Sequence, residues 1–145
     1  MVKLTKIYTR SGDDGSTALA DGTRRAKHDA RIAAYGAVDE TNAALGMARL
    51  YTKDHAALDA VLARLQNDLF DLGADLATPD DVDFEALRIT PAQVTRLESE
   101  IDTLNDKLQP LDSFVLPGGT EAAAHLHLAR SMRPMPLWAW RGFIP

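Results

Sequence analysis

The chain has 145 residues, which suits one domain with a real hydrophobic core. Hydrophobic residues make up 46%, charged residues 26%, and the net charge is −5, a globular balance that argues against a nucleic-acid groove. The absence of cysteine excludes disulfides, thiolate metal sites and a cysteine nucleophile. No apolar run suits a secretion signal or a membrane span, so we expect a cytoplasmic protein that binds neither membrane nor nucleic acid.

Residues 1–28 show turn chemistry in place of helical periodicity, and we expect them to form an extended arm that faces a ligand. The run from Tyr8 to Thr17 combines glycines, hydroxyls and two acids. Glycine lets backbone N–H groups approach a ligand closely, and hydroxyls donate to phosphate oxygens. Asp13 and Asp14 are suited to holding Mg²⁺. The run has no Walker pattern, and by itself it is equally typical of a surface turn.

The pattern becomes helical near residue 29. Over 29–52 one face carries Ile32, Tyr35, Val38, Asn42, Leu45 and Arg49. Over 58–76 the leucines step by four and three, which is typical of a seam in a helical bundle. We expect this second stripe to form core.

Two more helices are predicted further along the chain. Thr90 as N-cap, Pro91 at the first helical position and Gln93 complete a capping box. The apolar stripe over 94–108 then predicts another buried seam. A fourth helix begins at Thr120 and runs through Arg130.

Strand-like alternation is absent, so the sequence predicts an all-α, up-and-down helical bundle with four evident helices. We expect a single domain over 1–145, with an arm at 1–28, a bundle at 29–133 and an atypical tail at 134–145. His125 and His127 are two residues apart, so on a helix they project about 200° apart, and His28 and His55 are isolated. We therefore expect no zinc site and assign no metal-binding residue among the histidines.

Three segments, in this order and at these separations, resemble the PduO-type ATP:corrinoid adenosyltransferases. They are residues 8–17, the run AYGAVDETN at 34–42 and the run FVLPGGT at 114–120. The basic run RRAKHD at 24–29 also fits, and the resemblance extends from Lys6 to about Arg130. It implies transfer of the 5′-deoxyadenosyl group of ATP, bound with Mg²⁺, to cob(I)alamin, giving adenosylcobalamin and triphosphate.

The resemblance also implies residue roles. The positions that match the family's ATP-binding arm are Thr9, Arg10, Ser11, Gly12, Thr17 and Lys27. Arg24 and Arg25 lie in the same basic run, which taken by itself favours a solvated surface. A carboxylate beside a buried stripe needs a partner. Asp39 and Arg130 match two residues that form a salt bridge between subunits, although Asp39 is also an ordinary acid for a helix surface.

Phe114 matches a phenylalanine that lies against the lower face of the corrin ring. There it helps to exclude the dimethylbenzimidazole tail, which leaves the cobalt four-coordinate and easier to reduce from Co(II) to Co(I). The resemblance implies a homotrimer with sites between subunits. It also implies a flavoprotein electron donor and a cobalamin-dependent enzyme as partners.

The chain departs from the family after Arg130. Family members continue with a basic helical run and a fifth helix, whereas residues 131–145 contain Pro134 and Pro136, which do not continue a helix. A phosphate-binding arginine of the family would fall at Pro134. We expect an apolar face left without its usual cover, and slow turnover. A non-catalytic cobalamin- or nucleotide-binding module of the same fold, and a purely structural bundle, remain alternatives.

Overall fold

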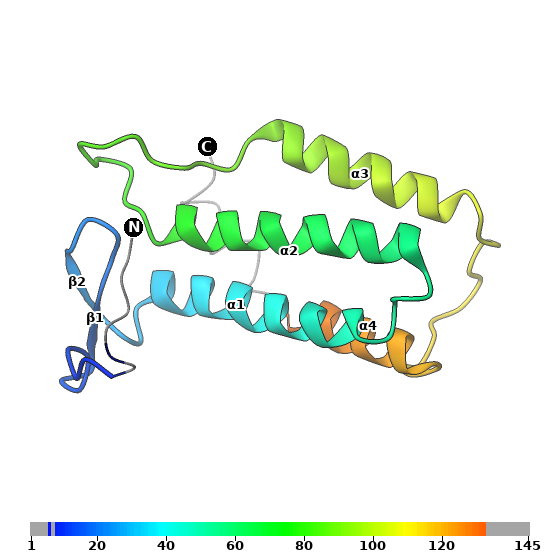
Figure 1. Cartoon of the computed structure of the whole chain (residues 1–145), viewed down its shortest axis with the longest axis horizontal. Helices are drawn as coiled ribbons and strands as arrows, with labels where there is room; N and C mark the ends of the chain where they lie inside the picture. Colours follow the sequence, from blue (N-terminus) through cyan, green and yellow to red (C-terminus); the bar gives the residue numbers. More distant parts are fainter. Residues whose placement is uncertain (1–5, 7, 133–145) are drawn as a thin grey trace.

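The computed structural model describes residue 6 and residues 8–132. The described elements are β1 (Ser16–Ala18), β2 (Arg24–Ala26), α1 (Ala30–Arg49), α2 (Ala56–Leu76), α3 (Pro91–Asn105) and α4 (Glu121–Ser131). The helices run up and down beside one another, and the two strands stand at one end of the bundle (Figure 1). The predicted helical bundle with four helices is confirmed. The predicted tail at 134–145 lies outside the described residues.

The helices begin where the sequence places start signals. Asp29 caps α1, and its carboxylate accepts a hydrogen bond from the amide of Arg31 at 2.8 Å. Thr90 and Gln93 form the predicted capping box of α3. The hydroxyl of Thr120 caps α4. Each cap supplies an acceptor to backbone N–H groups that have no partner within the helix.

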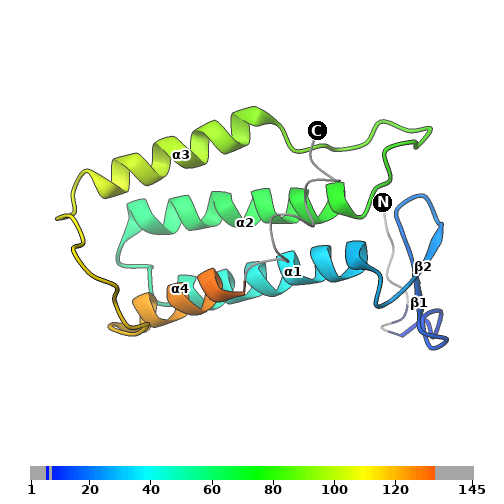
Figure 2. The same cartoon turned by 180° about the vertical axis from the view of Figure 1, so that it is seen from behind.

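The core lies where α1 packs against α2 and α4. One cluster of buried residues joins the first half of α1 to the end of α2, and it consists of Ala34, Val38 and Leu76. A second cluster joins the other half of α1 to α2 and α4, and it consists of Ala44, Leu45, Leu62 and Ala129. The short α4 runs antiparallel to α1 and covers only that second half, as Figures 1 and 2 both show. The stripe predicted over 58–76 is therefore part of the core.

The stripe predicted over 94–108 is not buried, and this expectation was wrong for the chain by itself. Val94, Ile101 and Leu108 are 51%, 62% and 66% exposed, and α3 has no buried residue. Polar contacts hold α3 beside α2 instead. Arg64 pairs with Glu100 at 2.7 Å, and Arg96 pairs with Asp68. Periodicity identifies an apolar face, but it does not identify what covers that face.

The arm contains a hairpin that the sequence did not predict. The strands β1 and β2 pair antiparallel, with Thr17 opposite Arg25. Three-residue strands are too short to show a period of two, which explains the omission. Leu19 in the turn is buried, and the amide of Ala20 donates to the carbonyl of Ala77 at 2.9 Å. The hairpin is thereby fixed to the end of α2.

Arginines also secure the end of α2. Arg88 donates to the carboxylate of Asp75 at 2.7 Å and to the carbonyl of Thr78 at 2.9 Å, while Arg31 donates to the carbonyl of Leu76 at 3.1 Å. These bonds satisfy carbonyls that a helix end leaves without a partner. None of the helices in residues 8–132 combines the length and apolarity needed to cross a bilayer.

Candidate functional site

The glycine-rich run of the arm forms two consecutive tight turns. The amide of Asp13 donates to the carbonyl of Arg10 at 3.3 Å, and the amide of Gly15 donates to the carbonyl of Gly12 at 3.2 Å. Arg10 has a φ of 58° and Gly15 a φ of 82°, so the backbone twice enters the left-handed region. Such turns point successive N–H groups in one direction, which is the geometry that receives anions.

The hydroxyls of the run are presented to solvent beside these turns. Thr9 and Ser11 are exposed and share a hydrogen bond between their hydroxyls at 2.8 Å. The guanidinium of Arg10 lies 5.5 Å from the ring centroid of Tyr8, a cation–π contact. Thr17 is half-buried in β1, two residues after Gly15 and opposite Arg25 of β2.

Lys27 brings a positive charge onto the same loop. A Cβ atom placed on Gly12 would lie 3.1 Å from both Cε and Nζ of Lys27 and 3.0 Å from the carbonyl oxygen of Ser16. A side chain at position 12 would therefore require Lys27 or the backbone at Ser16 to shift by a few tenths of an ångström. The amide of Lys27 also donates to the carbonyl of Gly15 at 2.9 Å. The structure therefore brings together all six residues predicted to bind nucleotide.

Arg24 holds this loop in shape. Its guanidinium donates to the carbonyl of Ser11 at 2.6 Å, to the hydroxyl of Ser16 at 2.8 Å and to the carboxylate of Asp14 at 3.3 Å. Asp14 also accepts from the amide and hydroxyl of Ser16 at 2.9 and 2.8 Å. These bonds from Ser16, with Arg24 adding to them, lower the pKa of Asp14.

The hydrogen bonds of Arg24 and Asp14 change two expectations drawn from the sequence. Arg24 is more than part of a solvated basic run, because its guanidinium bonds to Ser11 and Ser16 of the loop. The sequence did not reveal this role, because an arginine that bonds to a loop and one that only faces solvent can have the same neighbouring residues in the sequence. Both Asp13 and Asp14 are exposed, but Oδ1 of Asp14 already accepts hydrogen bonds from Ser16 and Arg24. Residues 8–132 contain no cluster of three or more acidic, histidine or cysteine side chains that would hold a metal.

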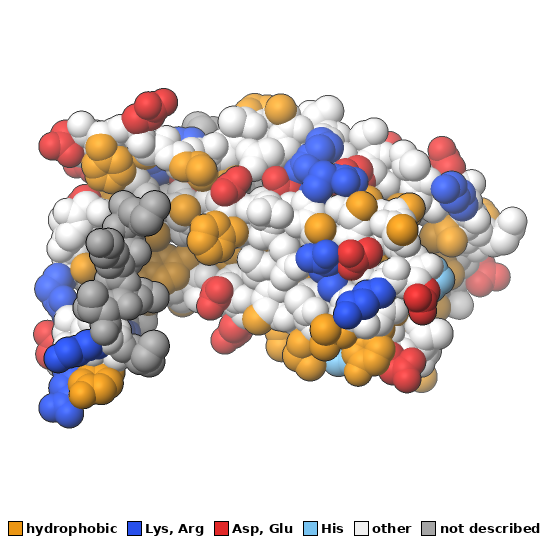
Figure 3. All heavy atoms as spheres, in the orientation of Figure 1, with side chains coloured by type: hydrophobic (Ala, Val, Ile, Leu, Met, Phe, Trp, Pro, Cys, Tyr) orange, Lys and Arg blue, Asp and Glu red, His pale blue; other side chains and the backbone are white. Residues whose placement is uncertain are grey.

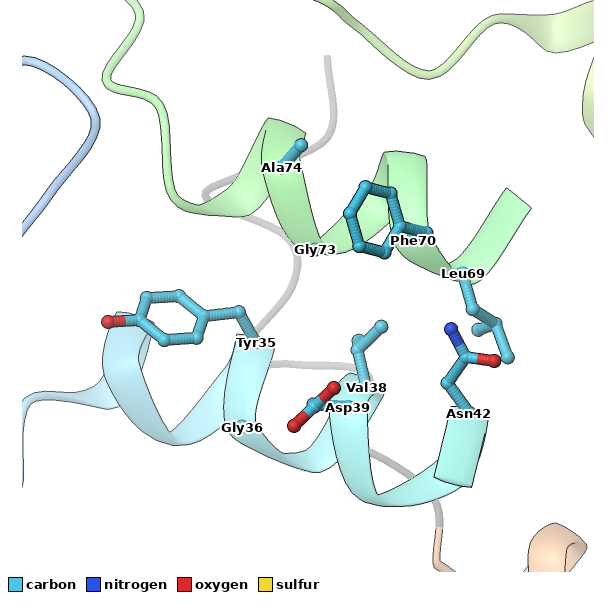
Figure 4. Close-up of a pocket in the computed structure, with 9 residues that line it drawn as sticks. All are labelled: Tyr35, Gly36, Val38, Asp39, Asn42, Leu69, Phe70, Gly73 and Ala74. Carbon is cyan, nitrogen blue, oxygen red and sulfur yellow. The ribbon is translucent and has the colours of Figure 1, made fainter. Parts of the chain in front are cut away.

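Asp39 lies at a groove between α1 and α2 (Figure 4). The groove has a volume of about 330 Å³ and is lined by Tyr35, Gly36, Val38, Asp39, Asn42, Leu69, Phe70, Gly73 and Ala74. Asp39 is exposed and lies next to Val38, a buried residue of the α1 stripe, so its carboxylate is beside that stripe and faces solvent in the single chain. Arg130 is exposed on α4, and no ion pair joins it to Asp39 within the described chain. The predicted pair between subunits stays a prediction.

Phe114 lies in the loop between α3 and α4 and is fully exposed, at 107%. Leu111 and Leu116 in the same loop are 78% and 91% exposed. Gly118 and Gly119 turn the chain into α4 with φ angles of 156° and 103°. This loop and the arm lie at opposite ends of the bundle (Figures 1 and 2). One chain therefore does not bring Phe114 to the nucleotide arm.

Comparison with known proteins agrees with this geometry. The family model for cobalamin adenosyltransferase matches residues 7–133. The chain is 48% identical over 136 residues to a corrinoid adenosyltransferase of Mycobacterium leprae (strain TN), covering 90% of this chain and 71% of the relative. It is 42% identical over 129 residues to the corrinoid adenosyltransferase PduO of Citrobacter freundii, covering 87% of this chain and 38% of the relative.

A solved structure shares the fold as well as the sequence. A variant PduO-type ATP:corrinoid adenosyltransferase from Lactobacillus reuteri, complexed with cobalamin and ATP, matches with a TM-score of 0.80 at 37% identity. The match covers 88% of this chain and 71% of the solved chain. Sequence and fold agree, and this chain belongs to the cobalamin adenosyltransferase family.

Proposed function

We propose that this chain transfers the 5′-deoxyadenosyl group of ATP to the cobalt of cob(I)alamin and releases triphosphate. The observation that carries the proposal is the arm, where Lys27 lies against the Gly12 turn beside the exposed hydroxyls of Thr9 and Ser11. This is a cationic, donor-rich loop of the kind that binds phosphates. The solved relative with the same fold is complexed with cobalamin and ATP.

In this proposal the arm binds the triphosphate. Lys27 and Arg10 neutralise its charge, the hydroxyls of Thr9 and Ser11 donate to its oxygens, and Gly12 and Thr17 keep the loop close to the phosphates. Mg²⁺ arrives with the nucleotide. We place it beside Asp13, because Oδ1 of the neighbouring Asp14 already accepts hydrogen bonds from Ser16 and Arg24.

The reaction needs no nucleophile from the protein. Co(I) of the corrinoid attacks C5′ of ATP, a cobalt–carbon bond forms, and the C5′–O bond breaks with its electron pair leaving on triphosphate. The cofactor-like substrate carries the difficult chemistry. The protein orients C5′ toward cobalt and stabilises the charge that develops on the leaving triphosphate, where Lys27 is placed.

We infer that a complete site needs more than one chain. The arm and Phe114 lie at opposite ends of the bundle, and α1 alone, with its 20 residues, is roughly 30 Å long. A homotrimer places the arm of one subunit near another subunit, with Asp39 and Arg130 paired across the contact. We further infer a cytoplasmic protein that receives electrons from a flavoprotein and delivers its product to a cobalamin-dependent enzyme.

The test is formation of adenosylcobalamin from ATP and cob(I)alamin, reduced chemically so that no reductase is needed. Lys27→Ala removes one charge-assisted contact worth about 1.5–3 kcal/mol, so we expect ATP to bind about ten- to a hundredfold more weakly. Lys107→Ala, which removes an exposed lysine just after α3, is the control and should change nothing. Equal ATP affinity in the two variants would remove Lys27 from the site.

The departure of the chain at Pro134 supports one alternative, a non-catalytic module that binds nucleotide or cobalamin. The same assay separates the two functions. Titrations that show ATP and corrinoid binding, with no adenosylcobalamin formed from cob(I)alamin, would favour the module. Product formed in proportion to enzyme and time would exclude it.

A further inference from the structure

The end of α2 lies beside the nucleotide arm. Figure 1 shows the hairpin of β1 and β2 standing next to the place where α2 ends and α1 begins. Among residues 8–28 only Leu19 is buried, and the amide of Ala20, which follows it, donates to the carbonyl of Ala77 at 2.9 Å. Leu19 and Ala20 thus form a hook that attaches the arm to the end of α2.

The hook rests on a helix end that depends on donors from elsewhere in the chain. The helix α2 ends at Leu76, and Ala77, Thr78 and Pro79 follow without the glycine that commonly closes a helix. The end of a helix leaves carbonyls without a partner inside the helix, and these carry the negative end of the helix dipole. The turn at 76–79 therefore needs donors from outside α2 to hold its carbonyls in place.

Arg88, shortly before α3, supplies several of these donors. Its guanidinium donates to the carbonyls of Thr78, at 2.9 Å, and Pro79. It also donates to the carboxylate of Asp75 at 2.7 Å, while the other oxygen of that carboxylate accepts from the amide of Ile89 at 2.8 Å. One planar guanidinium therefore clamps the turn after α2, and Asp75 holds that guanidinium in place.

The carbonyl that receives the arm lies between carbonyls that arginines hold. Arg31 of α1 donates to the carbonyls of Leu76 and Thr78 at 3.1 and 3.4 Å. The carbonyl of Ala77 lies between these two along the chain and accepts from Ala20 of the hook. Because each peptide unit is planar and rigid, the direction of the Ala77 carbonyl depends on where its two neighbours are held.

Attraction between surface charges is a weaker constraint on the arm. Figure 3 shows basic side chains on the arm and acidic side chains over the loop that follows α2, at the same end of the molecule. The acidic side chains of this loop are exposed, and they are Asp80, Asp81, Asp83 and Glu85. Exposed charges attract one another weakly and are screened by salt. The directional bonds at 76–79 therefore determine where the arm lies.

We propose that Arg88 is a positioning residue for ATP binding, which acts through the turn at 76–79 and the hook and touches no substrate itself. Without Arg88 the carbonyl of Pro79 loses its donor and that of Thr78 loses its nearer donor, so Ala77 no longer holds Ala20 in one direction. ATP must then order the arm as it binds, which lowers its affinity. This inference rests on the proposed function, because it takes the arm to be the ATP site.

Arg88→Ala in the full chain tests the proposal. Calorimetry should show ATP binding about tenfold weaker, the effect of losing one hydrogen bond to a charged group. Without ATP, the amide of Ala20 should exchange its hydrogen several-fold faster, because its acceptor has lost a fixed direction. Arg64→Ala is the matched control, because it also removes an arginine that pairs across α2 and α3. Arg64 lies about 18 Å along α2 from Leu76, so the control should change neither quantity.

A double-variant cycle separates positioning from a general loss of stability. Leu19→Ala loosens the hook from the side of the arm. If Arg88 and Leu19 act through the same hook, Arg88→Ala/Leu19→Ala should weaken ATP binding by less than the product of the two single effects. Thermal unfolding first establishes that each variant is folded. If Arg88→Ala does not fold, Arg88→Lys takes its place, because lysine keeps the charge but lacks the planar fork.

The outcomes distinguish this proposal from the proposed function. Folded Arg88 variants whose ATP affinity or Ala20 exchange matches that of Arg64→Ala would overturn the positioning role, as would single effects that simply multiply in the double variant. Weaker ATP binding with normal Ala20 exchange would place Arg88 on the nucleotide itself. An unmodified chain that binds no ATP, while its Ala20 exchange still depends on Arg88, would overturn the arm as the ATP site and confirm only the link between Arg88 and the hook.

Discussion

Arg24 is the residue on which the shape of the nucleotide arm depends. It joins Ser11, Asp14 and Ser16 through three sets of hydrogen bonds from one planar guanidinium. Lysine keeps the charge but cannot reproduce this fork. Since the Arg24 side chain is 44% exposed, we expect Arg24→Lys to weaken ATP binding only about three- to tenfold.

Calorimetry with ATP measures this effect, and hydrogen exchange of residues 9–16 separates positioning from direct contact. Faster exchange in Arg24→Lys without ATP would show that the loop has lost its order before any ligand binds. Arg25→Lys, at the neighbouring exposed position, is the control. Normal exchange together with weaker ATP binding would instead place Arg24 on the phosphates.

At the scale of single residues, the sequence predicted which residues belong to the nucleotide arm better than it predicted which side chains contact one another. The six residues Thr9, Arg10, Ser11, Gly12, Thr17 and Lys27 were predicted as one site, and the structure places them on one loop and hairpin. Their proximity follows from short separations along the chain. The roles of Arg24 and Asp14 could not be predicted, because they depend on which way a side chain turns once the hairpin has formed.

The junction of α1 and α2 is the clearest case of stabilisation by an ion pair between elements. Arg49 donates twice to Asp59, at 2.9 Å each, and Thr52, which is fully buried, donates to the same carboxylate at 2.9 Å. The bonds from Arg49 and then Thr52 lower the pKa of Asp59 from 3.8 to about 2, and they raise the pKa of Arg49.

A lowered carboxylate pKa stabilises the folded state above the unfolded pKa. For Asp59 this contribution is present above about pH 4 and is lost as the pH falls from about 4 to about 2. We expect Asp59→Asn to lower the free energy of unfolding at neutral pH and to flatten its fall over that window. Urea unfolding at several pH values measures both effects. Asp54→Asn, in the exposed part of the same junction, should keep the full acid dependence.

The loop between α3 and α4 gives a prediction for the corrinoid. If the exposed Phe114 forms the wall proposed for the lower corrin face, Phe114→Ala should leave ATP affinity near normal but readmit an axial ligand to Co(II). Electron paramagnetic resonance of bound Co(II) corrinoid should then lose its four-coordinate signal. Leu111→Ala, an exposed apolar residue of the same loop, should keep that signal. Loss of the signal in both variants would implicate the loop rather than the phenylalanine.

The elements themselves were predictable because their signals are local. Caps and apolar periods placed all four helices, including the capping box at Thr90. Two features of the fold were not predicted from the sequence, each for a physical reason. The strands Ser16–Ala18 and Arg24–Ala26 are too short to show alternation. The stripe over 94–108 looks like core in sequence, yet its burial depends on a partner that one chain does not supply.

On the scale of the whole molecule, the described chain leaves its apolar surface in separate places. Phe114, Leu116 and the exposed face of α3 lie on the half of the bundle away from the arm, while Phe70 lies at the α1–α2 groove. Sequence alone predicts that these residues are apolar but not that they stay exposed. Under the proposed assembly, neighbouring subunits and corrinoid cover the first group.

The proposed contact between Asp39 and Arg130 provides the sharpest test of assembly. Both side chains are exposed and without an ion pair in the described chain, so a partner subunit is the natural source of the opposite charge. Breaking an ion pair that assembly buries costs on the order of 3–5 kcal/mol. We therefore expect Asp39→Arg and Arg130→Asp each to shift the trimer toward monomer in sedimentation velocity and to abolish adenosylation.

The double variant Asp39→Arg/Arg130→Asp restores the opposite charges with their positions exchanged, so it should recover the trimer more fully than either single variant. Glu40→Arg, the neighbouring exposed acid, is the control for a simple change of net charge. If the trimer recovers in the double variant but not in either single variant, the two charges meet across the contact. The double variant has the same net charge as the unmodified chain, so a change in net charge cannot explain the difference between the variants. If both single variants remain trimeric at micromolar concentration, Asp39 and Arg130 do not pair, and the subunits meet through other surfaces.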